Sequence, residues 1–202
     1  MIETRKDLKR YLIADKFALG MTGKIPIPIK DYEHSQIWKF ERSLRFHEYY
    51  HNRWEKAFSL GRIYYRTMCL FWGFIQNRRG IKMGYTIPIN VFAEGLRINH
   101  IGPIIVNKWA RVGKFCDIHS CVNIGDNFSW DSVPQIGDNV WIGPGAKIFG
   151  KIHIGDRCVI GANAVVNKSF PEDVTIAGVP AKVIGAKGNQ IIRKISDAER
   201  WD

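Results

Sequence analysis

Residues 106–166 read VNKWARVGKFCDIHSCVNIGDNFSWDSVPQIGDNVWIGPGAKIFGKIHIGDRCVIGANAVV, and one spacing runs through the whole stretch. The positions six residues apart are Val106, Val112, Ile118, Ile124, Trp130, Ile136, Ile142, Ile148, Ile154, Ile160 and Val166. A period of six fits neither an amphipathic helix, which repeats every 3.6 residues, nor a strand, which repeats every two. A fixed repeat of one aliphatic residue, often followed by Gly, predicts a hexapeptide β-helix.

The period also predicts the shape of each coil. One hexad forms a short flat strand and a corner, and three hexads close a triangular coil of about 18 residues. The aliphatic side chain points into the prism, and we expect the Gly beside it to accept the positive φ of a tight corner. A β-sandwich with recurrent Gly turns is the alternative, but it has no reason to hold one phase from Val106 to Val166.

Three motifs extend this pattern: Ile142–Lys147 (IGPGAK), Ile160–Val166 (IGANAVV) and Ala177–Lys182 (AGVPAK). With them the chain resembles the hexapeptide acyltransferases over about residues 87–185. Within that superfamily it is most similar to the serine acetyltransferase branch, and especially to the O-acetyltransferases of bacterial capsule and surface-polysaccharide synthesis. The resemblance implies a mainly β fold, a left-handed parallel β-helix preceded by an α-helical N-terminal region.

We expect three parts in the chain. Residues 1–84 form the helical region, residues 85–185 the β-helix acyltransferase domain, and residues 186–202 a short C-terminal tail or helix. Helices are predicted over about 1–18, with Thr4 as N-cap, over 35–54 and over 55–77. The link 20–29 is rich in Gly and Pro and reads as extended, and residues 80–84 read as a hinge into the solenoid.

The third predicted helix is dense in aromatic and aliphatic residues. We expect it to be buried on most sides, where it would cap the open end of the prism or pack against a partner subunit. Docking on a membrane surface is the alternative. Its longest uncharged stretch, between Arg66 and Arg78, is shorter than the roughly 20 residues of a transmembrane helix.

The net charge of +11 is concentrated in residues 1–85, which hold 17 Lys and Arg against 8 Asp and Glu. No nucleic-acid-binding motif accompanies this charge. An anionic glycan, a lipid-linked precursor or a membrane surface fits a polysaccharide enzyme better, and a solvated basic face without a partner is equally open.

The N-terminus lacks an apolar signal region, and the four Cys form no CxxC pair. We therefore expect a cytoplasmic protein with reduced thiols at core positions. A location at the inner face of the membrane is left open, because the basic N-terminal region could contact it.

His47 and His51, with Glu48 between them, match the HExxH pattern of zinc proteases. A zinc site needs a third protein ligand, and a Glu or His would have to follow on the chain. No acidic residue occurs between Glu55 and Glu94. We interpret the pattern as coincidence and expect no metal.

The hexad phase breaks at His100, where an aliphatic residue is due six positions before Val106. His119 follows at close to one coil length, so the two imidazoles are predicted on neighbouring coils near the same corner. Transfer of an acetyl group to a hydroxyl needs a general base that titrates near neutral pH, and His is that residue type. A pair of structural histidines bonded to carbonyls is the alternative.

The resemblance makes the same assignment, because residues 95–100 correspond to the segment with the family's catalytic His. Three departures change the expected acceptor. Tyr85 stands where the family has an orienting Asp, Ser132-Val133 stand where it has Arg-His, and Asn99 replaces an Asp. Loss of groups that bind an amino acid's charges predicts a sugar hydroxyl in place of L-serine. The partner that orients His100 is left among Glu94, Asp117 and a backbone carbonyl.

The resemblance further implies acetyl-CoA as donor, bound in a seam between adjacent prisms. Pro144 and Ala162 would line that seam with main-chain groups, Pro180 lies in the third motif, and Lys168 and Lys182 suit the CoA phosphates. Such a seam implies a cyclic homotrimer.

The expected function is therefore direct acetyl transfer from acetyl-CoA to a sugar hydroxyl of a surface polysaccharide or its precursor, with His100 as base. The alternatives are serine O-acetyltransferase, a γ-carbonic anhydrase-like zinc enzyme and a non-catalytic β-helix scaffold. The zinc enzyme usually has two His five residues apart, which His100, His119 and His153 lack.

Overall fold

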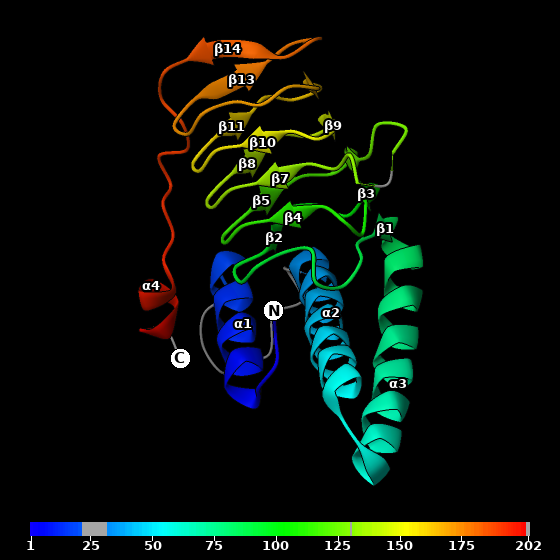
Figure 1. Ribbon diagram of the computed structural model, residues 1–202. Helices are drawn as coiled ribbons and strands as arrows, with labels where there is room; N and C mark the ends of the chain where they lie inside the picture. The colour runs from blue at the N-terminus through cyan, green and yellow to red at the C-terminus, as the bar shows by residue number, and fades with distance from the viewer. Residues whose placement is uncertain (22–31, 130, 201–202) are drawn as a thin grey trace.

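The computed structural model describes residues 1–21, 32–129 and 131–200. Three helices come first, strands follow, and a short helix ends the described chain (Figure 1). The helices are α1 (Arg5–Ala18), α2 (Tyr32–Lys56), α3 (Ser59–Met83) and α4 (Ile195–Glu199). The strands are β1 (Tyr85–Thr86), β2 (Arg97–Ile98), β3 (Ile104–Val106), β4 (Arg111–Val112), β5 (Asp117–Ile118), β6 (Val122–Gly125), β7 (Gln135–Ile136), β8 (Trp141–Ile142), β9 (Lys147–Phe149), β10 (His153–Ile154), β11 (Val159–Ile160), β12 (Val165–Val166), β13 (Thr175–Ala177) and β14 (Lys182–Gly185). The predicted link over 20–29 falls almost wholly outside the described residues.

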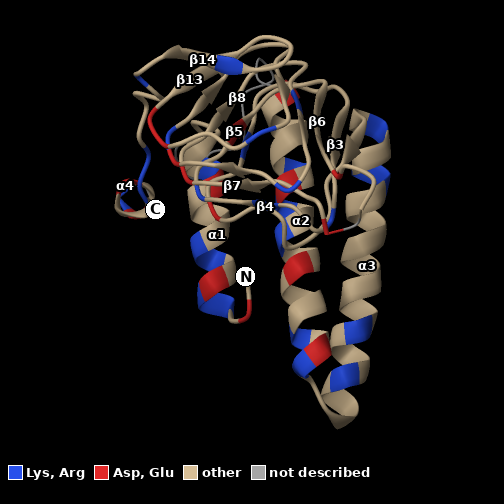
Figure 2. Cartoon of the chain, turned by 45° about the horizontal axis from the view of Figure 1, so that its top comes forward, with Lys and Arg blue, Asp and Glu red and all other residues tan. Residues whose placement is uncertain are grey.

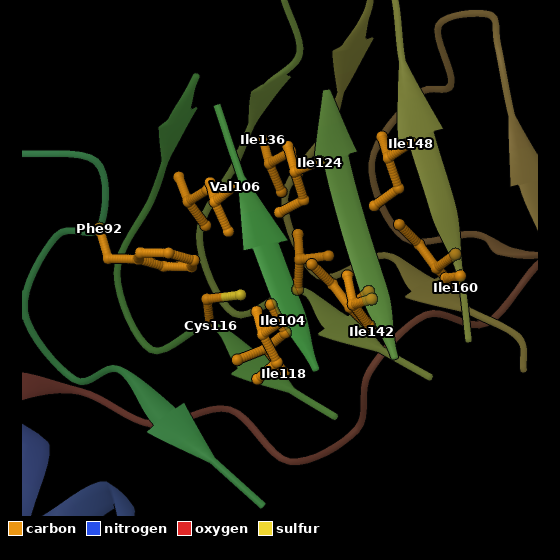
Figure 3. Close-up of a cluster of buried hydrophobic side chains, with 14 of the residues drawn as sticks. Phe92, Ile104, Val106, Cys116, Ile118, Ile124, Ile136, Ile142, Ile148 and Ile160 are labelled. Atoms are coloured by element: carbon orange, nitrogen blue, oxygen red, sulfur yellow. The ribbon is translucent and has the colours of Figure 1, made fainter. Parts of the chain in front are cut away.

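The strands form three sheets, which are the sides of a triangular prism. Their orders are β1-β3-β6-β9-β12, β10-β7-β4 and β14-β13-β11-β8-β5-β2, and the pairs are parallel except β13 with antiparallel β14. The predicted left-handed parallel β-helix with a helical N-terminal region is confirmed. The described hexad positions are at most 5% exposed and stack along the prism axis (Figure 3). Burial of this aliphatic column is the main favourable term in folding.

The coil length varies along the prism, and it departs most from three hexads at one point. Ile104 pairs with Val122 and Trp141 with Val159, each pair three hexads apart, but Asn123 pairs with Lys147, four hexads away. The additional hexad lies in the connection between β6 and β7. Because the insertion is one whole hexad, the phase continues beyond it. Residue 130 itself lies outside the described residues.

The glycines of the hexads have a different role from the predicted one. Positive φ occurs two residues after the Gly, as at Asn139, Arg157 and Asn163, and Gly137 and Gly155 do not adopt it. A Cβ on Gly155 would lie 2.7 Å from the carbonyl carbon of Pro171 and from Cα of Glu172 on the next coil. These glycines are therefore needed because successive corners approach too closely for a side chain.

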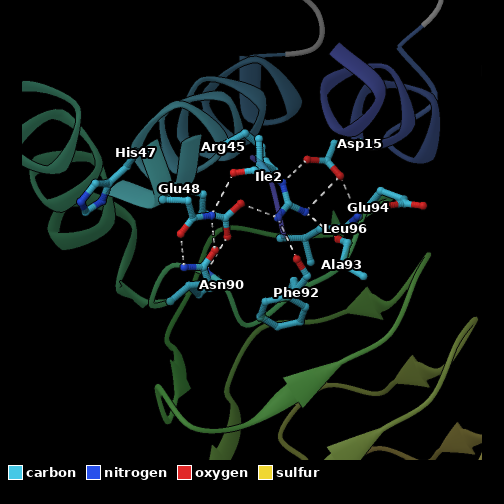
Figure 4. Close-up of polar contacts among 12 residues, drawn as sticks. Ile2, Asp15, Arg45, His47, Glu48, Asn90, Phe92, Ala93, Glu94 and Leu96 are labelled. Atoms are coloured by element: carbon cyan, nitrogen blue, oxygen red, sulfur yellow. Dashed lines mark hydrogen bonds and ion pairs between the residues drawn. The ribbon is translucent and has the colours of Figure 1, made fainter. Parts of the chain in front are cut away.

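A buried ionic cluster joins the helices to the first coil (Figure 4). Arg45 on α2 is fully buried and donates to Asp15 on α1 at 2.7 Å, to Glu48 at 3.0 Å and to the carbonyl oxygens of Phe92 and Ala93 at 2.8 Å. Burial raises the pKa of the Asp15 and Glu48 carboxyl groups, while the adjacent guanidinium lowers it. A buried charge needs such partners, so this cluster fixes the helices under the prism.

Helix α3 packs on α2 through one face, where Phe46 of α2 stacks on Trp72 at 4.5 Å between ring centroids. The expectation that α3 is buried on most sides is wrong within this chain, because its opposite face is exposed. The expected hinge at 80–84 is also wrong: residues 80–83 belong to α3, and Gly84 ends the helix with φ 78°. The Thr4 N-cap of α1 is confirmed, with its hydroxyl accepting from the Asp7 N–H at 3.0 Å.

The C-terminal segment returns along the outside of the prism toward the helices (Figure 1). Asn189 donates through its side-chain amide to the Asn139 carbonyl oxygen at 2.9 Å, and its N–H to that of Arg157 at 2.6 Å. Ile195 then packs near Phe115 and Ala14 of α1. We call residues 186–199 the C-terminal strap. None of the helices described is apolar over a sufficient length to span a bilayer.

Candidate active site

The two imidazoles singled out by the sequence lie together. Strand β2 pairs with β5, with Ile98 opposite Ile118, so the turns after them carry His100 and His119 at one corner. The ring centroids are 6.2 Å apart. The His100 side chain is 62% exposed, while His119 is half-buried against Trp141 at 4.6 Å between centroids. The prediction that they share a corner of adjacent coils is confirmed.

The environment of His119 sets its tautomer. Nδ1 lies 2.9 Å from the Ile142 carbonyl oxygen. A carbonyl oxygen can only accept, so Nδ1 carries the proton in the neutral ring and Nε2 holds the free lone pair. His119 thus presents an acceptor nitrogen toward whatever occupies the corner.

Glu33, in the first turn of α2, faces His100 and was not among the residues predicted from the sequence. Its Oε1 lies 3.6 Å from His100 Nδ1 and accepts the Ile101 N–H at 2.7 Å. An acid in the first turn is favoured by the helix dipole, but this local signal does not indicate which distant loop it meets. The fold supplies His100 with a carboxylate partner from the helical region.

Asp117 and Asn99 belong to the same corner but do not orient His100. The Asn99 side-chain amide donates to Asp117, which also accepts from Arg97 at 2.9 Å and from Arg193 of the C-terminal strap at 3.5 Å. Asp117 is buried and fully engaged by these partners. It fixes the backbone position of the turn with His100 indirectly, through Asn99.

Glu94 and Tyr85 have other partners. Glu94 is buried and pairs with Arg10 at 3.6 Å and with Lys114 at 3.4 Å, away from the imidazoles. The Tyr85 hydroxyl donates to the His100 carbonyl oxygen at 3.1 Å, and burial raises its pKa. Tyr85 therefore holds the His100 main chain, and Glu94 belongs to the contacts beneath the first coil.

Beyond the imidazoles, the same corner continues up the prism as a column of small residues. The Gly145 N–H donates to the Ser120 carbonyl oxygen at 3.0 Å, and the Asn163 N–H to that of Pro144 at 2.9 Å. Pro144 and Ala162 are both exposed and occupy equivalent positions on successive coils. The small side chains of these corner residues leave room for an extended ligand along the column.

The remaining residues expected at the CoA site are dispersed. Pro180 and Lys182 are exposed near the last coil, where Lys182 pairs with Ala177 across β13 and β14. Lys168 follows β12, at a different corner from Ala162, and its Nζ lies 5.5 Å from the Phe170 ring centroid. We call the corner that carries His100 and His119 the histidine corner. Within one chain, Pro144 and Ala162 lie on the continuation of this corner, and Lys168 does not.

The HExxH residues do not form one cluster. Glu48 is engaged by Arg45, His47 Nδ1 contacts Gln76 Oε1 at 2.6 Å, and His51 Nε2 lies 3.3 Å from Glu55. Burial lowers the pKa of His47. Over the described ranges, no three His, Cys, Asp or Glu side chains are arranged to hold a metal ion.

The cysteines are not all core residues. Cys69, Cys116 and Cys158 are buried, but Cys121 is exposed, two residues after His119, so the expectation of four core thiols is wrong at this position. Its backbone has φ 63°, which turns the chain out at the corner. An exposed thiol near the imidazoles makes it the one cysteine to test for a covalent route.

Comparisons with known proteins show which family the repeat resembles. Residues 134–168 match the family described as bacterial transferase hexapeptide (six repeats). The serine acetyltransferase of Mycobacterium tuberculosis is 40% identical over 107 residues, which are 52% of this chain and 44% of that protein. That of Escherichia coli K12 is 34% identical over 115 residues, which are 55% of this chain and 42% of the relative. The chain thus spans less than half the length of these relatives.

Solved structures extend the similarity into the helical region. The serine acetyltransferase of Brucella abortus in complex with coenzyme A has a TM-score of 0.67 and 27% identity, over 92% of this chain and 71% of that one. The Neisseria gonorrhoeae enzyme in complex with serine has a TM-score of 0.62 and 27% identity, over 88% and 69%.

These findings correct the expected acceptor. A surface-polysaccharide sugar is wrong as the predicted acceptor, because the relatives at 34–40% identity are serine acetyltransferases. The expectation counted charged groups lost at matched positions along the chain. The fold brings other charges to the corner, from Glu33 and Arg193, which such counting could not find. The chain has the fold of the hexapeptide-repeat acyltransferases and carries their repeat at residues 134–168.

Proposed function

We propose that this protein is an acetyl-CoA-dependent O-acetyltransferase whose acceptor is the hydroxyl group of L-serine. The observation that carries the proposal is the pair His100 and His119, 6.2 Å apart at the head of an exposed column of small corner residues. The similarity to serine acetyltransferases, including structures with coenzyme A and with serine, supports the choice of donor and acceptor. In this proposal residues 85–185 are the acyltransferase domain, residues 1–84 support it, and 186–202 add the tail with Arg193.

In the proposed reaction His100 is the general base. With Nδ1 directed at the Glu33 carboxylate, the lone pair of Nε2 is available to the acceptor. Nε2 takes the hydroxyl proton as the oxygen attacks the thioester carbon, a C–O bond forms, and the C–S bond breaks. The thiolate of CoA leaves and takes the proton from the imidazolium. His119, with its own free Nε2, positions the acceptor hydroxyl.

The donor is proposed to lie along the corner of Ser120, Pro144 and Ala162. The small side chains leave room for an extended pantetheine arm, and exposed main-chain groups are near it. The column from Ser120 to Gly178 spans three coil spacings, roughly 14 Å. Lys168 is proposed to reach CoA from an adjacent copy, because within one chain it is at another corner. This arrangement needs a cyclic homotrimer, in which each seam joins two prisms.

The test is release of free thiol from acetyl-CoA with L-serine as acceptor, with product identified by mass spectrometry. Loss of a general base costs about 10²–10⁴ in rate, so His100→Ala should fall by that factor while it still folds and binds acetyl-CoA. His153→Ala changes an exposed imidazole on β10 and is the matched control, expected to keep full rate. Cys121→Ser should also keep its rate, because direct transfer needs no thiol.

Three outcomes contradict the proposal. If the protein binds acetyl-CoA but transfers no acetyl group to L-serine, L-serine is not the acceptor. If calorimetry detects no acetyl-CoA binding, a non-catalytic β-helix scaffold is favoured. If His100→Ala keeps more than about a tenth of the rate, the base is elsewhere, since the expected loss is at least about 10². Then His119→Ala is the next variant to measure.

A further inference from the structure

Helix α3 presents an apolar face that no other described part of the chain covers. The face consists of Leu60, Ile63, Leu70, Phe71, Phe74 and Ile81, which we call the α3 outer face. These side chains are between 52% and 82% exposed. Spacings of three and four residues place them on one side of the helix. Exposed apolar side chains in a continuous patch mark an interaction site.

The opposite side of α3 is committed to the fold. Cys69, Gln76 and Met83 are buried there, and Trp72 stacks on α2. The Gln76 side-chain amide donates to the Ile87 carbonyl oxygen at 2.9 Å, which ties the helix to the entry of the prism. Substitutions on the outer face therefore leave these contacts in place, and a test can separate binding from folding.

The charges on α3 all have one sign. Arg62, Arg66, Arg78 and Lys82 are exposed, and α3 contains no acidic residue (Figure 2). No Asp or Glu occurs between Glu55 and Glu94 in the sequence. The guanidinium of Arg78 lies 5.7 Å from the Phe74 ring centroid, so a cation borders the apolar surface directly.

This combination decides between two occupants of the face. In a two-fold contact, a second copy of α3 would bring the same cations against each other, because such a contact pairs identical surfaces. A bilayer with anionic headgroups satisfies both parts: the acyl boundary takes the apolar side chains, and the phosphates meet the Arg and Lys side chains. We propose that the α3 outer face binds the surface of an anionic phospholipid membrane.

The position of α3 allows this contact. The helix lies at one side of the molecule and its length, 25 residues, corresponds to about 37 Å along the surface. Gly84 at its end leads directly into β1 and the first coil of the prism. Membrane binding therefore holds the first coil, where Tyr85 of β1 donates to the His100 carbonyl oxygen, at the end of the bound helix. The catalytic step proposed above does not require this binding.

The test uses co-sedimentation of the full chain with two kinds of vesicle. One is phosphatidylcholine alone, and the other contains roughly one third phosphatidylglycerol, which gives a negative surface. The protein should bind the anionic vesicles, bind the neutral ones much less, and dissociate as salt is raised. The physical reason is that the Debye length falls from about 10 Å at 0.1 M to 3 Å at 1 M.

Two double variants test separately the two proposed contributions to membrane binding, the cations and the apolar side chains of α3. Arg66→Gln with Arg78→Gln should lower the partition coefficient about fivefold for each cation removed. Leu70→Gln with Phe74→Gln should lower it about tenfold or more for each apolar side chain. The matched controls are Lys151→Gln with Lys187→Gln, and Val183→Gln with Ile184→Gln, which change exposed cationic and aliphatic residues away from α3, on the prism and the C-terminal strap. These controls should bind as the unmodified protein does.

The outcomes are distinct from those of the acetyl-transfer assay. Failure to bind anionic vesicles, equal binding to neutral vesicles, or an equal loss in the prism controls each overturns the membrane proposal. Sedimentation without lipid tests whether the α3 outer face instead pairs copies of the chain. An assembly of several copies that dissociates in the variant Leu70→Gln with Phe74→Gln would show such pairing, and it would also overturn the membrane proposal. Retained acetyl transfer by the α3 variants in solution separates this proposal from the proposed function.

Discussion

The Glu33 carboxylate lies 3.6 Å from Nδ1 of His100 and also accepts the N–H of the next residue, Ile101, at 2.7 Å. One side chain from the start of α2 thereby holds both the ring and the main chain of the turn that carries the proposed base. The helical region thus contributes a side chain to the candidate site.

Glu33→Gln should lower kcat for acetyl transfer by about tenfold, less than the roughly 10²–10⁴ of losing the base itself, because the ring loses only a charged orienting partner. The KM for acetyl-CoA should not change, since the corner of Pro144 and Ala162 is untouched. Glu55→Gln removes an exposed carboxylate that also faces an imidazole, that of His51, at the other end of α2. Steady-state kinetics should show no effect in this control, and equal losses in both variants would remove Glu33 from the site.

Arg45→Met should destabilise the fold by about 3–5 kcal/mol, because it leaves Asp15 and Glu48 buried without their cation. Urea unfolding followed by circular dichroism measures the change. Arg157→Met is the comparison: Arg157 also binds two carboxylates, Asp173 and Glu172, but at the surface. Arg157→Met should lower the free energy of unfolding much less. Similar losses in both variants would show that burial of an ion pair does not determine how much stability is lost when its cation is removed.

Glu41→Gln should make the stability less sensitive to pH. Glu41 is fully buried, and burial, together with the charge of Asp15, raises its pKa well above the ordinary value of 4.5. The folded protein therefore keeps this proton in a range where the unfolded chain has lost it. The stability that Glu41 contributes is full below pH 4.5 and is lost as pH rises through its folded pKa.

The measurement is the free energy of unfolding of both proteins from pH 4.5, the ordinary pKa, up to neutral pH. The wild type should lose stability relative to Glu41→Gln across this range, by about 1.4 kcal/mol for each pH unit between the two pKa values. Parallel curves would mean that the carboxyl group ionises equally in both states.

Gly155→Ala should destabilise the prism by more than about 1 kcal/mol, the usual effect of one substitution, because backbone atoms of the next coil would have to move. Gly61→Ala is the counterpart, since its Cβ would meet nothing within 4 Å. That exposed helical position should gain about 1 kcal/mol from the higher helix propensity of Ala. Thermal melts compare the two, and a neutral Gly155→Ala would show that the coils can separate at the corner.

The hexad pattern was sufficient to predict the prism, because burial at every sixth residue leaves one way to fold the stretch. It also placed His100 and His119 together, since stacking of coils converts a sequence distance into a spatial one. It could not predict Glu33, which is 68 residues from Ile101 and meets it through helix packing. It also missed the additional hexad between β6 and β7, because an insertion of one whole hexad keeps the phase.

The exposed face of α3 had no counterpart in the sequence pattern either. Dense apolar residues at 60–81 are compatible with a core, a partner or a membrane. The position of α2 shows which side of α3 is covered. Once the exposed side is known, the fact that all charges on α3 are positive indicates the kind of partner that this side could bind.

The C-terminal strap changes how the prism can open. In a solenoid each coil touches only its neighbours, so the end coils can fray while the middle persists. Here Asn189 bonds to Arg157 and Asn139, Arg193 reaches Asp117, and Ile195 packs near α1, so one segment fastens several levels of the stack to the base. The last coil and the first helix then belong to one cooperative unit. Amide hydrogens at the two ends should exchange at a common slow rate, as they do in a structure that unfolds as a whole.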